Sequence, residues 1–118
     1  MKIYAFDVDE TLEVSGGPVK INDLVTLKKE GHILGICGNF AVGTHGIPSW
    51  AQLFSFLGPM GMTKAGFLDQ IRTYVPPAEE YVMVGNDDRY FGQSKDKQAA
   101  DEAGWRFIRE YAFADGAR

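Results

Sequence analysis

The sequence predicts an α/β fold of three layers, in which a mostly parallel, Rossmann-like sheet carries helices on both faces. Short apolar, β-prone segments alternate with amphipathic segments along the 118-residue chain, and this alternation is typical of βαβ units joined by right-handed crossovers. The 14 glycines lie in turns between these segments rather than in linkers. A chain of this length is expected to form a single domain, 1–118.

Four segments are expected to be strands. Residues 3–9 are nearly all apolar up to an acidic end, as in a strand that is covered on both faces. Residues 32–37 are expected to form a second buried strand, and residues 81–84 and 105–108 two further strands.

Helices are expected between these strands, at about residues 22–30, 48–57, 65–74 and 94–103. Asn22 is suited to cap the first helix and Gly31 to end it. Residues 38–48 contain three glycines and are predicted to form a loop. Residues 109–118 are weakly patterned and are predicted to form a loose tail.

The composition excludes several classes of function. The formal net charge of −4 argues against a protein that binds bulk nucleic acid or an anionic membrane surface, since both need a basic face. Cys37 is the single cysteine, which excludes an intramolecular disulfide and a multi-cysteine metal site. An acidic residue at position 7 interrupts the N-terminal apolar run too early for a signal peptide, and no apolar run approaches the roughly 18 residues of a membrane span. We therefore expect a cytoplasmic protein with no membrane partner.

Acidic and amide side chains follow the ends of three expected strands. Asp7 and Asp9 follow the first, Asn39 the second, and Asn86, Asp87 and Asp88 the third, with Asp96 shortly after. In a parallel sheet these ends lie at one edge, where ligands bind. Carboxylates crowded there repel one another unless a cation joins them, and oxygen ligands favour Mg²⁺. Lys64 is placed to balance the charge of a bound anion.

Asp7 and Asp9 are two residues apart, so on an extended strand their side chains share one side. One carboxylate can then attack while the other transfers a proton. Aspartate is a nucleophile in phosphoryl transfer, where it forms an aspartyl phosphate, and the remaining requirement is a metal and donors around the phosphoryl oxygens.

The segment Asp7-Val8-Asp9-Glu10-Thr11 resembles the first motif, Asp-x-Asp-x-Thr, of the haloacid dehalogenase superfamily of phosphohydrolases. Further resemblances follow in the family's order over nearly the whole chain. Cys37-Gly38-Asn39 falls where the family has a Ser or Thr at the end of the second strand, and Lys64 falls where it has its basic residue. Residues 84–88 followed by Asp96 resemble its acidic fourth motif.

The resemblance implies a role for each matching residue. Asp7 would be the nucleophile and a Mg²⁺ ligand. Asp9 would be the general acid and base, with its backbone carbonyl on the metal. Lys64 would orient Asp7 and the phosphate, and Thr11 would hold the loop. The phosphate would also contact Thr11, Cys37, Gly38 and Asn39. The third metal ligand would be Asp87, with Asn86 and Asp88 as alternatives, and Asp96 would assist.

Two positions depart from the family pattern. Cys37 replaces a hydroxyl residue, and a thiol is a weak hydrogen-bond donor. The usual Gly-Asp of the fourth motif is Gly85-Asn86-Asp87, and the gap to Asp96 is several residues longer than is common.

The two segments in which the family inserts a cap domain are short here, at about a dozen residues after Thr11 and at residues 39–64. A capless enzyme is therefore expected, with either a large substrate or a second copy of the chain as its lid. The predicted function is Mg²⁺-dependent hydrolysis of a phosphomonoester, on a small molecule or a macromolecular end. The alternative is a weakly active or inactive module that binds Mg²⁺ or phosphate in a regulatory or interaction role. A phosphoacceptor receiver domain is less favoured, because receivers carry the acceptor aspartate on a middle strand.

Overall fold

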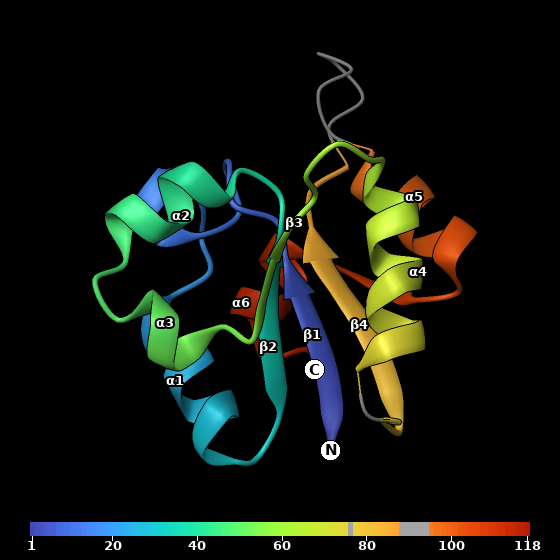
Figure 1. Cartoon of the computed structure of the whole chain (residues 1–118). Coiled ribbons are helices and arrows are strands. Elements are labelled where there is room, and N and C mark those ends of the chain that lie inside the picture. Colours follow the sequence, from blue (N-terminus) through green and yellow to red (C-terminus); the bar gives the residue numbers. More distant parts are fainter. Residues whose placement is uncertain (76, 88–94) are drawn as a thin grey trace.

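The computed structural model describes residues 1–75, 77–87 and 95–118. Over these residues, parallel strands form one five-stranded sheet in the order β3-β2-β1-β4-β5 (Figure 1). The strands are β1 (Lys2–Phe6), β2 (Ile33–Cys37), β3 (Phe56–Gly58), β4 (Glu80–Gly85) and β5 (Arg106–Arg109). The central strand β1 pairs with β2 and β4 along its whole length or nearly so. The predicted α/β class with a parallel sheet is confirmed.

Helices cover both faces of this sheet, as the sequence predicts. Tyr4 and Phe6 of β1 belong to an apolar cluster shared with α1 (Ile21–Lys29), α3 (Trp50–Leu53) and α6 (Glu110–Ala114). Ile3 and Ala5 point to the opposite face and join a second cluster with α4 (Lys64–Tyr74) and α5 (Asp96–Ala103). Because alternate residues of β1 are buried on opposite faces, the strand is apolar throughout rather than at every second position.

The segment after β2 differs from the expectation of a loop followed by one long helix. Residues in the expected loop form α2 (Phe40–Gly46), which is capped by the Asn39 side chain through an N–H···Oδ1 bond of 3.3 Å from Val42. The expected helix over 48–57 is only the short α3, after which the chain becomes extended and joins the sheet edge as β3. Leu57 there pairs with Ile36 of β2. A short apolar run does not distinguish helix from strand by its periodicity.

Helix α1 begins one residue earlier than expected, and Asn22 does not cap it. The N-cap residue is Lys20, whose side chain makes no cap hydrogen bond. The carboxylate of Glu13 accepts the Ile21 N–H at 3.2 Å instead. A carboxylate from outside the helix therefore satisfies a donor of its first turn.

The predicted loose tail at residues 109–118 is wrong, because these residues complete β5 and form α6. Phe113 is fully buried, and its ring packs edge-on against Phe6 with the centroids 5.4 Å apart. The Arg118 guanidinium donates to the Phe113 carbonyl at 2.7 Å and lies over the Phe113 ring. The segment is thus anchored to the core through Phe113, while residues 114–117 are exposed.

Two connections lie beside the carboxyl edge of the sheet. Residues 7–20 contain the 3-10 turn η1 (Glu13–Ser15), and residues 38–63 contain α2, α3 and β3. Both connections are fully described, and neither holds a separate domain over the sheet edge. Among the helices of the described residues, none has the length and apolar character needed to cross a membrane.

Candidate active site

Asp7 lies directly after β1, at the carboxyl edge of the sheet. Its backbone N–H donates to the Val84 carbonyl at 2.9 Å, which extends the pairing of β1 and β4 by one residue. The residue is 4% exposed. One carboxylate oxygen, Oδ1, lies 3.1 Å from Lys64 Nζ, and the other, Oδ2, accepts a hydrogen bond of 3.1 Å from Thr11. The backbone of β1 and partners on both oxygens therefore hold the carboxylate in place.

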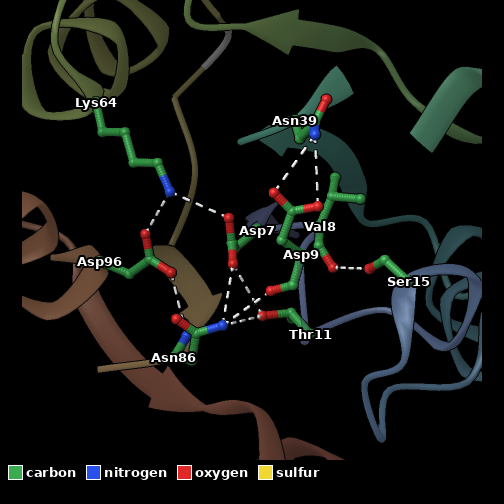
Figure 2. A network of polar contacts seen from close by, with 9 residues as sticks. All are labelled: Asp7, Val8, Asp9, Thr11, Ser15, Asn39, Lys64, Asn86 and Asp96. Atoms are coloured by element: carbon green, nitrogen blue, oxygen red, sulfur yellow. Dashed lines mark hydrogen bonds and ion pairs between the residues drawn. The ribbon is translucent and has the colours of Figure 1, made fainter. Parts of the chain in front are cut away.

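Lys64 connects Asp7 to a second buried carboxylate. It is the first residue of α4, and its Nζ lies 2.6 Å from Oδ1 of Asp96, the first residue of α5. Asp96 is fully buried, and its Oδ2 accepts the Asn86 N–H at 3.1 Å. One ammonium thus lies between two carboxylates that come from opposite ends of the sequence (Figure 2).

This burial shifts the pKa of both ion-pair partners. Burial, reinforced by the nearby Asp96 charge, raises the pKa of Asp7 to about 6, against the opposing effects of Lys64 and Thr11. Burial alone would lower the pKa of Lys64, but Asp7 and Asp96 outweigh it and hold that pKa above its ordinary value. Lys64 is therefore a permanent cation at neutral pH, and Asp7 titrates within reach of neutral pH.

The side chain of Asn86 occupies the centre of the site. Asn86 follows β4, and its Nδ2 donates to the Asp9 carbonyl at 2.9 Å, and to Asp7 Oδ2 and Thr11 Oγ1, both at 3.3 Å. The residue favoured for this place was Asp87, which lies one position further along the chain. Asp88, the other alternative, lies outside the described residues.

Asp9 turns its carbonyl into the site and its carboxylate outward. Since β1 ends at Phe6, the alternation of an extended strand does not orient Asp9 as expected. Both oxygens of its exposed carboxylate instead lie 3.4 Å from Asn39 Nδ2. Because Asn39 Oδ1 caps α2, its amide nitrogen faces Asp9 (Figure 2).

Cys37 lies beneath the site, close to the charges of Lys64, Asp96 and Asp7. Its side chain is fully buried in the apolar cluster with Phe67 and Leu68, and burial raises the pKa of its thiol to about 12. The neighbouring Gly38 borders Asp7 instead, where a Cβ would lie 2.6 Å from Asp7 Oδ1. Its N–H is already donated to the Gly58 carbonyl at 2.8 Å. Gly38 thus permits the Asp7 carboxylate to approach the backbone closely and offers no side-chain donor.

Ser15 was not identified from the sequence, and Gly85 was named there only as part of the acidic motif, without a role of its own. The Ser15 hydroxyl donates to the Val8 carbonyl and fastens η1 to the segment between Asp7 and Asp9. A Cβ at Gly85 would lie 2.3 Å from Asp96 Oδ2, so only glycine leaves room for that carboxylate. A glycine at a strand end before a polar residue was a usable signal for Gly85, whereas nothing in the sequence marks Ser15.

The donor set is compatible with a hard cation. Within the described ranges, no three His, Cys, Asp or Glu side chains gather as a metal-binding group. Oxygens nevertheless converge: Asp7 Oδ2, the Asp9 carbonyl and Thr11 Oγ1 all lie within 3.3 Å of one atom, Asn86 Nδ2. Rotation of the Asn86 amide about χ2 would present its Oδ1 in place of that nitrogen. The residues therefore fit Mg²⁺, with a low ligand charge.

No family model, curated protein or solved structure matches the chain. Function is therefore inferred from the chemistry of the site itself.

Proposed function

We propose that the protein is a Mg²⁺-dependent phosphohydrolase of the haloacid dehalogenase type, which cleaves a phosphomonoester through an aspartyl phosphate. The observation that carries this proposal is the placement of Asp7. Its carboxylate lies at the carboxyl edge of a parallel sheet, 3.1 Å from the Lys64 ammonium and two residues from the exposed carboxylate of Asp9. The order of the sequence motifs supports the family assignment.

In this proposal the residues divide the reaction between them. A carboxylate oxygen of Asp7 forms a bond to phosphorus while the bond from phosphorus to the leaving oxygen breaks, and Asp9 gives a proton to that oxygen. Asp9 then takes a proton from a water molecule, whose oxygen attacks the phosphoryl group and releases Asp7. Lys64 keeps Asp7 oriented and attracts the negatively charged phosphoryl group, and Asp96 fixes Lys64 from behind.

Asp7, the Asp9 carbonyl and Asn86 are the residues of this proposal that would hold Mg²⁺. Asp87 remains a candidate from the sequence. When bound, the cation neutralises the charge on the phosphoryl oxygens. Asn39, beside the Asp9 carboxylate, is positioned to contact the substrate.

The substrate is proposed to be a phosphorylated small molecule or the phosphorylated end of a macromolecule. Neither connection at the sheet edge holds a separate domain, so the substrate itself or a second copy of the chain would exclude water. Light scattering distinguishes these cases: a monomeric mass in the presence of substrate removes the second copy. A cytoplasmic location, as the sequence predicts, belongs to the same proposal.

The test is hydrolysis of p-nitrophenyl phosphate and a panel of phosphate esters, with and without Mg²⁺. We expect turnover that requires Mg²⁺, that is abolished in Asp7→Asn, and that falls about 10²–10⁴-fold in Asp9→Asn. Asp69→Asn, an exposed aspartate of α4, is the matched control and should retain full activity. Undiminished turnover in a folded Asp7→Asn protein would refute the mechanism.

One observation favours a second candidate, an inactive or weakly active module that binds Mg²⁺ or phosphate in a regulatory role. The oxygens that would hold the cation, from the Asp7 carboxylate and the Asp9 carbonyl, are bridged by the neutral amide nitrogen of Asn86. Stabilisation by Mg²⁺ or phosphate without hydrolysis of any ester in the panel would support the module over the enzyme.

A further inference from the structure

Three oxygens from one turn of the chain surround a single nitrogen from another. The Asp9 carbonyl, Asp7 Oδ2 and Thr11 Oγ1 belong to the segment after β1, and the Nδ2 that they face belongs to Asn86 after β4 (Figure 2). An amide nitrogen has two hydrogens, which these three acceptors share. Thr11 uses its own hydrogen on Asp7 Oδ2, so its oxygen is an acceptor toward Asn86. The NH₂ group thus draws together oxygens that would otherwise repel one another.

We propose that the Asn86 amide takes the place of a cation in the metal-free protein and competes with Mg²⁺ for the same oxygens. A hard cation prefers this kind of surrounding, formed by carboxylate and carbonyl oxygens. To admit it, the amide nitrogen must leave, and a rotation about χ2 both removes the nitrogen and presents Oδ1. Asn86 is therefore a positioning residue that assembles the site without metal and sets the affinity for metal.

The backbone of Asn86 is held independently of its side-chain amide. Its backbone N–H donates to Asp96 Oδ2 at 3.1 Å, and Asp96 in turn pairs with Lys64. The backbone is thereby held while the terminal amide turns, because χ2 of asparagine has a broad, two-fold profile. Asp7 Oδ1 contacts Lys64 and Asp7 Oδ2 contacts the Asn86 amide, so the proposed exchange concerns the Oδ2 side of that carboxylate.

This inference deepens the proposed function and rests on it for the identity of the cation. It predicts that a carboxylate at position 86 destabilises the metal-free protein and raises its affinity for Mg²⁺. Asn86→Asp loses the donor to the Asp9 carbonyl and places a third carboxylate beside Asp7 and Asp96, so the metal-free variant should unfold at a lower temperature than the wild type. It gains a charged ligand, so its affinity for Mg²⁺ should rise at least about tenfold.

The experiment measures Mg²⁺ binding by calorimetry and thermal unfolding with and without Mg²⁺, using the metal alone as the probe. We expect a large Mg²⁺-dependent rise in Tm for Asn86→Asp and a small one for the wild type. Asn22→Asp makes the same charge change at an exposed position of α1 and should bind Mg²⁺ as the wild type does. Equal Mg²⁺ affinity in Asn86→Asp and the wild type would overturn the proposal.

A second measurement on the wild type covers the case in which Asn86→Asp does not fold. Titration with Mg²⁺ should shift the side-chain NH₂ resonances of Asn86 and hasten their exchange with water, while those of Asn22 stay unchanged. Mg²⁺ binding that leaves the Asn86 NH₂ signals unmoved would refute the exchange. Neither readout depends on turnover, so the two proposals can fail separately. Tighter Mg²⁺ binding in Asn86→Asp with no hydrolysis in the wild type would refute the proposed function and support this inference. Mg²⁺-dependent hydrolysis with unmoved Asn86 signals would support the proposed function and refute this inference.

Discussion

Replacing Lys64 by methionine should destabilise the protein strongly, because it leaves two buried carboxylates facing each other. The Lys64 ammonium lies 3.1 Å from Asp7 and 2.6 Å from Asp96, whose side chains are 6% and 0% exposed. Removing one partner of a buried ion pair costs about 3–5 kcal/mol. The Lys64 side chain is itself 27% exposed, so water partly screens these charges and we expect the lower end, about 3 kcal/mol.

The loss should depend on pH in a defined direction. A proton on Asp7 can replace the missing ammonium, so the pKa of Asp7 in folded Lys64→Met lies even further above its unfolded value than in the wild type. A carboxyl whose pKa is raised on folding loses stability as pH rises from the unfolded to the folded pKa. The deficit of the variant against the wild type should therefore be smallest near pH 5 and largest near pH 8.

Urea unfolding at pH 5 and pH 8, followed by the fluorescence of buried Trp105, measures this deficit. The matched control is Lys97→Met, which breaks an exposed ion pair with Asp101 of 2.8 Å between side chains 51% and 58% exposed. That variant should lose no more than about 0.5 kcal/mol at either pH. Adding Asp96→Asn to Lys64→Met should recover part of the stability at pH 8. Equal losses for the two lysine variants at pH 8, or a deficit that shrinks as pH rises, would refute the reasoning.

Three further predictions follow from burial. Wild-type stability should fall by up to about 3 kcal/mol between pH 4 and pH 6, because Asp7 ionises there in the unfolded state while its raised pKa of about 6 keeps it protonated in the folded state. Urea titrations across this range should lose that slope in Asp7→Asn, and an unchanged slope would contradict the assignment. Cys37 should resist thiol reagents at pH 8 in the native protein and react once the protein is unfolded in urea, because it is fully buried; rapid native labelling would show that the thiol is accessible. Phe113→Ala should cost about 3–5 kcal/mol in urea unfolding, whereas a dispensable tail would give no change.

The sequence was sufficient to predict the architecture because the two patterns that indicate it, apolar runs and amphipathic spacing, are local. The strands β1, β2 and β4 are short, nearly continuous apolar runs, which indicate burial on both faces regardless of which strands become neighbours. The edge strand β5 carries only Phe107 and Ile108 between two arginines. The helices between the strands follow from amphipathic spacing. The contact between Lys64 and Asp7, which the family resemblance implies, is present at 3.1 Å.

The short elements depended on contacts far away in the sequence. Residues 56–58 are a strand because Leu57 finds Ile36 beside it, and that partner lies 21 positions earlier. The last ten residues are ordered because Phe113 packs against Phe6 of the central strand. Segments of three to five residues carry too few apolar positions for a period to be recognised, so their structure is decided by the surface on which they pack.

The finer assignments at the site depended on which way each backbone turns after its strand. Asn86, which contacts Asp7, is one residue away from Asp87, the residue favoured by the sequence. Likewise Gly38, which borders Asp7, is one residue away from Cys37, which is buried. In a strand, a shift of one residue moves a side chain to the opposite face. The sequence alone thus determined that carboxylates, amides and one lysine meet at the edge of the sheet. Only the tertiary structure decided which atoms touch, because register and the close packing around Gly38 and Gly85 arise from contacts between strands and helices that lie far apart along the chain.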